Sequence, residues 1–218
     1  MLLPYRDINP TRRFPAVTVL LIMTNVLIFY GLVFSRAGFD ALTAQFALIP
    51  YEIHNGNLPG SEMLSPWITL GTYMFMHGGF GHLAFNMLFL WIFGNNIEDR
   101  MTRSGFLLFY LLVGVLSGLA FELKNPGSRV SLVGASGAIS GVLGAYLLLF
   151  PFARVHALFF IFPVRMPAVV FLVIWFITQI AGFRGAQGNV AWISHISGFI
   201  AGIVLHRFFL VRQMSPRY

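Results

Sequence analysis

Long apolar runs separated by short polar stretches dominate the pattern along this chain. Six such segments can be distinguished, and they lie approximately at 15–34, 82–97, 105–121, 136–150, 166–182 and 190–210. Several are shorter than the about 20 residues that cross a bilayer comfortably. Short segments are tolerated where the protein thins the bilayer or where a helix end faces a protein-lined cavity. The pattern therefore predicts an all-α membrane protein with six membrane-spanning helices.

These segments also predict the organisation of the chain. We expect an N-terminal tail at 1–14, a helical domain at 15–210 and a C-terminal tail at 211–218. The first loop, at about 35–81, is too long to be structureless, and its apolar residues suggest short amphipathic pieces at the membrane interface. No cleavable signal peptide is expected, because the first apolar run is too long and lacks a small-residue cleavage site.

Composition agrees with a membrane protein and excludes several kinds of chemistry. The chain is 57% hydrophobic and 10% charged, with a mean hydropathy of +0.78. It has no cysteine, which excludes disulfides, thiolate metal sites and a cysteine nucleophile. The net charge is +7, but the basic residues are scattered at segment ends rather than striped along one face. Nucleic acid is therefore not expected as a partner.

The basic residues also predict the orientation. With six spans, one side would carry ten of them: Arg6, Arg12, Arg13, Arg100, Arg103, Arg154, Arg165, Arg207, Arg212 and Arg217. The other side would carry Arg36, Lys124, Arg129 and Arg184. By the positive-inside rule, this asymmetry places both termini in the cytoplasm.

Candidate chemistry lies at the outer ends of three segments. Ser136 follows Gly134 and opens the fourth segment, His195 lies near the start of the sixth, and His82 starts the second. The 15 residues of 136–150 form about 22 Å of helix, whereas the hydrocarbon core is about 30 Å thick. Ser136 would therefore lie below the outer surface, and water would have to reach it through a cavity. Polar residues at such a depth are costly and usually functional.

Small residues predict how two of these segments pack. The fourth has Gly137, Gly141 and Gly144 at helical spacing, and the sixth has Gly198 and Gly202. Such faces favour close helix contact, which would bring Ser136 within reach of His195. An isolated serine in a membrane helix is more often a packing residue, and the lipase pattern Gly-x-Ser-x-Gly is not satisfied.

The remaining polar residues indicate a dyad rather than a triad. None of the seven acidic residues lies in the outer half of a span near His195, so its imidazole would act alone as general base and then general acid. His82 and Asn86 share a helix face, and with the backbone N–H of Ser136 they are candidate oxyanion donors. Alternatively, they bond to each other or to a loop. As metal ligands they form a poor set, and no metal is expected.

Together these motifs resemble the rhomboid family of intramembrane serine proteases. Three motifs carry the resemblance: Gly134-Ala135-Ser136-Gly137, His82 to Asn86, and Ala191 to Gly202 with His195 and Gly198. It implies a six-transmembrane-helix rhomboid bundle with a partly membrane-embedded first loop, in a bacterial inner membrane. Ser136 would be the nucleophile and His195 the base, with oxyanion roles for His82, Asn86 and the Ser136 backbone.

The resemblance also assigns supporting roles and has two departures. His77 matches a histidine that shapes the first loop, and Glu98 with Arg100 resembles a structural acidic-x-Arg element. Some relatives carry an aromatic residue where this chain has Ser140, so the orientation of His195 must depend on other packing. Some also have Trp-Arg in the first loop, whereas Trp67 is followed here by Ile68.

The implied activity is hydrolysis of a peptide bond in a substrate's transmembrane segment near the outer face, without a cofactor. The partners would be the lipid bilayer and single-span membrane-protein substrates that enter laterally between the second and fifth segments. Two other functions remain open: a small transporter with a polar path, and a non-catalytic chaperone or adaptor like the derlins. The sequence leaves the oligomeric state open.

Overall fold

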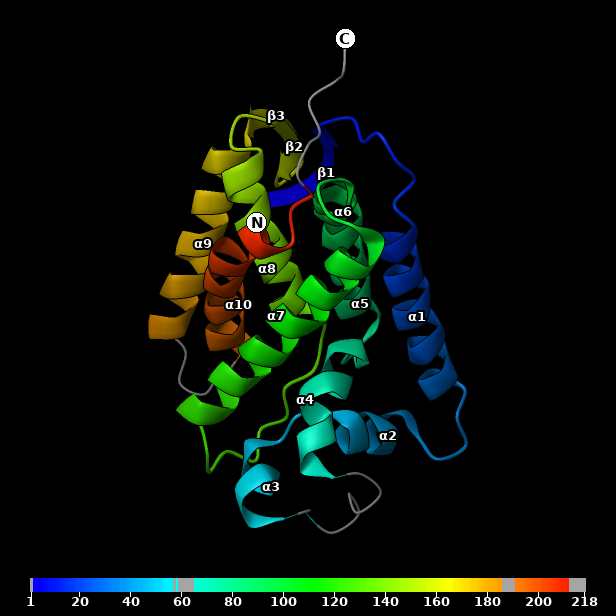
Figure 1. Cartoon of the computed structure of the whole chain (residues 1–218). Helices are drawn as coiled ribbons and strands as arrows, with labels where there is room; N and C mark the ends of the chain where they lie inside the picture. Colours follow the sequence, from blue (N-terminus) through cyan, green and yellow to red (C-terminus); the bar gives the residue numbers. More distant parts are fainter. Residues whose placement is uncertain (1, 57, 59–64, 186–190, 212–218) are drawn as a thin grey trace.

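The computed structural model describes residues 2–56, 58, 65–185 and 191–211. The predicted C-terminal tail after residue 211 lies outside the described residues, and so does Val190, the first residue of the predicted sixth segment. All six apolar segments are helical (Figure 1). They correspond to α1 (Ala16–Val33), α5 (Phe80–Phe89) continued by the π-helical η3 (Leu90–Gly94) and α6 (Asn95–Asp99), α7 (Arg103–Lys124), α8 (Ser136–Leu149), α9 (Ala168–Gly185) and α10 (Ala191–Leu205). By length and composition alone, α1 and α7 are the helices of the described part that could cross a membrane.

The first loop forms short helices at one end of the bundle, as predicted (Figure 1). They are α2 (Phe39–Phe46), α3 (Pro50–Asn55), η1 (Pro66–Ile68), α4 (Thr69–Thr72) and η2 (Tyr73–Phe75). Tyr73 fixes this layer to α7, because its fully buried hydroxyl bonds to the carbonyl oxygen of Gly114 and to Ser117 Oγ, each at 2.8 Å.

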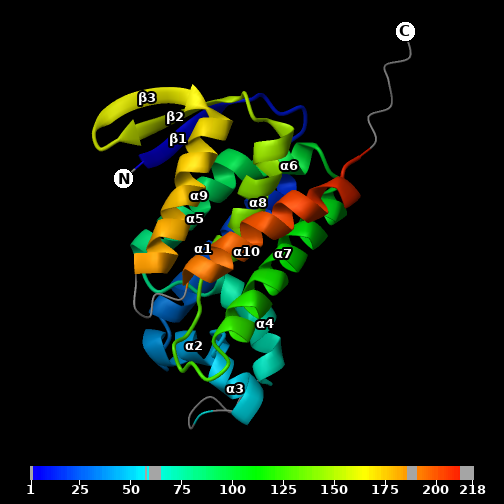
Figure 2. The same cartoon turned by 90° about the vertical axis from the view of Figure 1, so that its left-hand side faces the viewer.

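A three-stranded antiparallel sheet lies at the other end, so the fold is mostly helical, as predicted, but not all-α (Figures 1 and 2). Its strands are β1 (Leu2–Ile8), β2 (Arg154–Phe159) and β3 (Phe162–Pro167), in the order β1-β2-β3. The fifth helix therefore begins at Ala168, two residues later than predicted. Met166 and Pro167 instead pair with β2. The side chain of Asp7 joins β1 to α8, since it accepts a hydrogen bond from Tyr146 Oη at 2.7 Å.

The predicted contact between the fourth and sixth segments is confirmed. A Cβ atom added to Gly198 would lie 2.2 Å from the carbonyl oxygen of Gly137. One added to Gly202 would lie 2.0 Å from that of Gly141. A Cβ atom cannot approach another atom this closely, so only glycine allows α8 and α10 to pack backbone against backbone.

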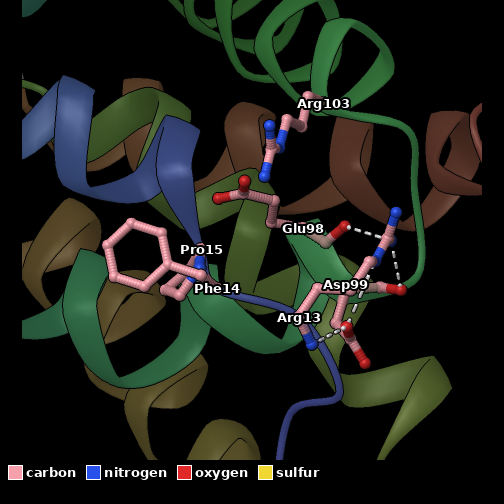
Figure 3. Close-up of a pocket in the computed structure, with 6 residues that line it drawn as sticks. All are labelled: Arg13, Phe14, Pro15, Glu98, Asp99 and Arg103. Atoms are coloured by element: carbon pink, nitrogen blue, oxygen red, sulfur yellow. Dashed lines mark hydrogen bonds and ion pairs between the residues drawn. The ribbon is translucent and has the colours of Figure 1, made fainter.

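A polar cluster at the sheet end of the bundle joins α1 to α6 (Figure 3). Glu98 accepts hydrogen bonds from the backbone N–H groups of Val17 and Thr18, at 2.9 and 2.8 Å, and from Thr18 Oγ1 at 2.8 Å. A carboxylate at a helix N-terminus satisfies free N–H groups and complements the helix dipole. Arg13 binds alongside, donating to the carbonyl oxygens of Asp99 and Met101 at 2.7 and 2.8 Å.

Replacing Glu98 by alanine is expected to destabilise the fold by about 2 to 3 kcal/mol, because two buried N–H groups lose a charged acceptor. Thermal unfolding in detergent would measure the loss. Glu98→Gln, which keeps an acceptor oxygen, should lose less. Asp40→Ala, at an exposed position in the first turn of α2, is the matched control. Equal stability of the Glu98 and Asp40 variants would contradict a capping role.

Candidate active site

Ser136 is the first residue of α8, and a sharp turn precedes it. Gly134 adopts φ +115°, which residues with a side chain rarely adopt, and its N–H donates to the carbonyl oxygen of Tyr73 at 2.9 Å. A Cβ atom there would lie 2.7 Å from His82 Nε2. Gly134 therefore serves two needs, the turn into α8 and the close approach of α5.

His195, on α10, lies within hydrogen-bond distance of the serine. Its Nε2 is 2.8 Å from Ser136 Oγ. The glycine-mediated packing of α8 on α10 sets this distance, because both residues lie at the same end of the contact. The structure thus brings together the two residues that the sequence singled out.

A third residue, Gln179 on α9, was missed by the sequence analysis. Its Oε1 lies 2.8 Å from His195 Nδ1, and its side chain is only 6% exposed. An acceptor at Nδ1 holds the proton there and leaves the Nε2 lone pair directed at the serine. The available signal was an uncharged polar residue in an otherwise apolar segment, since such residues usually face the interior of a bundle.

Aromatic rings complete the surroundings of His195. The ring of Trp175 on α9 lies 6.4 Å from the imidazole, and that of Trp192 on α10 lies 6.1 Å away, edge to face. Ser140, at the position where some relatives carry an aromatic residue, bonds back to the Ser136 carbonyl oxygen at 2.6 Å. The rings of Trp175 and Trp192 thus pack beside His195, where Ser140 offers no aromatic ring.

The serine opens onto a cavity of about 340 Å³. Its polar lining includes Ser136, His195, His82, Asn86 and Gln179. The rest of the lining is largely apolar and comes from all four surrounding helices, with Phe85 and Phe89 on α5, Ile139 and Leu143 on α8, Trp175 on α9 and Trp192 on α10. The cavity lining therefore combines a few polar side chains with apolar side chains suited to an apolar ligand.

Asn86 and His82 line this cavity from α5. The Nδ2 group of Asn86 is buried and finds no acceptor among the described residues. Such an unsatisfied donor is costly unless a ligand completes it. None of the hydrogen bonds described for this part of the chain joins Asn86 to His82 or to a loop, so the alternative arrangement is not observed.

His77 lies behind His82, with the two ring centroids 5.2 Å apart. It belongs to the turn before α5 and is fully buried. Burial, and then the positive charge of a protonated His82, lower the pKa of His77 from 6.5 to about 4. At neutral pH this side chain is therefore uncharged and serves packing.

The lowered pKa of His77 predicts a pH dependence of stability. Between pH 6.5 and about 4 the unfolded chain binds a proton that the folded chain does not, so the free energy of unfolding decreases as the pH falls through this range. The loss from this residue should reach at most about 3 kcal/mol. Denaturant unfolding of wild-type protein and His77→Gln at neutral and acidic pH would measure it. Equal acid sensitivity of both proteins would contradict the assignment.

Comparisons with known proteins agree on one family. The Rhomboid domain model matches residues 64–212. The chain is 32% identical over 189 residues to the rhomboid protease GluP of Bacillus subtilis, which covers 86% of this chain and 34% of GluP. It is 35% identical over 135 residues to the mitochondrial Rhomboid protein 1 of Saccharomyces cerevisiae, covering 60% and 38%. It is 26% identical to the putative rhomboid protease YdcA of Bacillus subtilis, covering 95% and 94%. The chain thus spans about a third of the first two relatives and nearly all of the third.

Proposed function

This chain belongs to the rhomboid family, and from that premise we propose that it is a serine endopeptidase that cleaves membrane proteins within their transmembrane segments. The observation that carries the proposal is the 2.8 Å contact between Ser136 Oγ and His195 Nε2, two residues that line one cavity. A hydroxyl bonded to an imidazole base is the arrangement that activates a serine nucleophile.

The proposed reaction has two steps. His195 Nε2 removes the proton from Ser136 Oγ as that oxygen attacks the scissile carbonyl carbon, and the imidazolium then protonates the leaving amine. Water attacks the resulting acyl-enzyme, with His195 acting again as base and then acid. Asn86 Nδ2, His82 and the Ser136 N–H stabilise the oxyanion in both steps, since donors fixed in a water-poor cavity act strongly on developing charge.

We propose that all six long helical elements cross the membrane, with both termini in the cytoplasm. The excess of arginine at the sheet end supports this orientation. It places the cavity toward the outer face, in a bacterial inner membrane. Phe85 and Phe89 of α5 and Trp175 of α9 all line the cavity, which supports lateral access for a substrate helix between α5 and α9. A helix must unwind locally to expose its amides, so small or helix-destabilising residues are expected near the cleaved bond.

Within this mechanism Gln179 is a positioning residue. Gln179→Leu removes the acceptor at His195 Nδ1, so both the tautomer and the ring orientation become variable. We expect kcat to fall by about 10- to 100-fold with little change in KM. Gln179→Glu, which keeps an acceptor oxygen, should recover most of the activity.

Steady-state cleavage in detergent, with kcat and KM determined separately, would test this role. Ile177→Ala, at an exposed position on α9, is the matched control and should retain activity. A rise in KM alone, or failure of Gln179→Glu to recover kcat, would point to a structural role instead.

Covalent labelling tests the proposed function itself. A fluorophosphonate or isocoumarin probe should modify the folded protein at a single residue, and peptide mass spectrometry should locate the label on Ser136. Labelling elsewhere, or no labelling of protein shown to be folded, would favour the transporter or the derlin-like chaperone. Co-expression with candidate single-span proteins would then identify substrates by cleavage that depends on Ser136.

A further inference from the structure

The β2–β3 hairpin has an exposed apolar tip that the proposed chemistry does not use. Its four consecutive residues Phe159, Phe160, Ile161 and Phe162 are each more than half exposed. Figure 2 shows the hairpin turn extending sideways beyond α9. A contiguous patch of large apolar side chains marks an interaction surface.

The conformation of this turn is unfavourable for the residues that form it. Phe159 pairs with Phe162, so the turn contains only Phe160 and Ile161. Phe160 adopts φ +55°, where bulky residues are rare, and two-residue hairpin turns favour asparagine and glycine. The turn thus presents bulky apolar groups at a local conformational cost, which a contact made by those groups would offset.

The two faces of the hairpin differ in character. Directly paired residues share a face, and side chains alternate along each strand. Val155 and Ala157 are fully buried against the bundle, and Phe159 extends the same face past its edge. The opposite face is basic: Arg6 and Arg165 are both paired with His156 across the sheet, and all three arginines of the sheet are exposed.

The guanidinium groups of Arg6, Arg154 and Arg165 lie close enough together to act on the side chain of His156. Burial, and then the positive charges of Arg165, Arg6 and Arg154, lower the pKa of His156. His156 is therefore neutral at neutral pH, and the positive charge of this face comes from the arginines. Such a cluster complements an anionic surface.

The short helices place the sheet at the depth of the lipid headgroups. The 14 residues of α8 span about 21 Å, less than the about 30 Å of the hydrocarbon core. Because the deficit lies at the Ser136 end, the Leu149 end of α8 reaches the cytoplasmic boundary of the hydrocarbon core, and the sheet that follows it lies in the interface. The apolar surface continues directly after β3, because Val170, Val173, Ile174 and Ile177 of α9 are also exposed.

We propose that this hairpin docks into the cytoplasmic leaflet of the bilayer, with its apolar tip among the acyl chains and Arg6, Arg154 and Arg165 on anionic phospholipid headgroups. The proposal depends on the orientation proposed above. Amphipathic elements lie in the membrane interface with their apolar side chains among the acyl chains and their basic side chains at the headgroups. The alternative, a soluble protein partner, would require the tip to face water.

A single introduced cysteine can locate the tip, because the chain has none of its own. We would attach a polarity-sensitive fluorophore to Ile161→Cys and reconstitute the protein into phosphatidylcholine vesicles containing phosphatidylglycerol. Gly127→Cys, in an open loop, is the matched control. A lipid-borne quencher on the acyl chain should quench the label at 161 strongly and the label at 127 weakly. Equal quenching by an aqueous quencher at both positions would overturn the docking.

The role of the arginines has its own measurement. Each basic residue near an anionic surface strengthens binding by about fivefold, so Arg6→Gln with Arg165→Gln should reduce phosphatidylglycerol retained after purification. Retention of phosphatidylcholine should be unchanged. Equal retention of phosphatidylglycerol by wild type and variant would overturn the headgroup contact.

All these measurements use protein carrying Ser136→Ala, so they do not depend on catalysis. If the hairpin does not dock but the covalent probe still labels Ser136 in wild-type protein, the docking proposal is wrong and the proposed protease function stands. Cysteine labelling in intact cells tests the orientation separately. Reagent reaching position 127 only from the cytoplasmic side would overturn the orientation and, with it, the choice of leaflet.

Discussion

Ser136→Ala should reduce cleavage of a reconstituted single-span substrate to background, a loss of about 10⁵-fold or more, since removal of the nucleophile of a serine protease has an effect of this size. The fold should persist, because the substitution removes one hydroxyl whose described partner is His195 Nε2. The measurement is substrate cleavage in proteoliposomes together with thermal unfolding of the same samples.

A second serine provides the control for this substitution. Ser197, on α10 two residues after His195, bonds back to the carbonyl oxygen of Ile193 at 2.7 Å and does not line the cavity. Ser197→Ala should therefore retain activity. Substantial cleavage by folded Ser136→Ala would refute the proposed nucleophile, whereas loss of activity in both variants would indicate a general sensitivity to serine substitution.

Gly202→Ala should have the largest effect on stability. The added Cβ would lie 2.0 Å from the Gly141 carbonyl oxygen and 2.5 Å from its Cα, so the backbones of α8 and α10 must separate. Overpacking of this kind costs about 3 kcal/mol or more, and here no flexible side chain can yield. Separation of the two helices would also pull His195 away from Ser136, so activity should fall with stability.

Gly31→Ala is the matched control, because Gly31 lies on α1 with nothing within 4 Å of the added Cβ. It should be neutral or stabilising by up to about 1 kcal/mol, since alanine is the better helix former. Thermal unfolding in detergent and susceptibility to added protease would compare the two. Equal stability of both variants would contradict the assigned helix contact.

The helices and the serine–histidine contact could be predicted because each depends on a short-range pattern. Apolar runs located the helices to within a few residues. Glycines at helical spacing on two segments, Gly141 and Gly202 among them, predicted which helices touch. That one contact was sufficient to bring Ser136 and His195 together.

The sheet and Gln179 could not be predicted in the same way. In β2 the alternation of Arg154, Val155 and His156 is a short pattern between apolar segments, and the pairing of β2 with β1 joins residues more than 140 positions apart. Gln179 is one polar residue in an apolar helix, and its partner His195 becomes visible only once α9 is packed on α10. Both features depend on tertiary contacts that no local pattern encodes.

The burial of α8 has a consequence for how this protein can diversify. Every residue from Gly137 to Tyr146 is buried, whereas α9 exposes Val173, Ile174 and Ile177 on its outer side. The outer side of α9 can therefore change with little effect on packing, whereas the helix that begins at Ser136 cannot. In a deep mutational scan, α8 should form an intolerant band and α9 should alternate between tolerant and intolerant positions, so sequence change should accumulate on the outer side of α9.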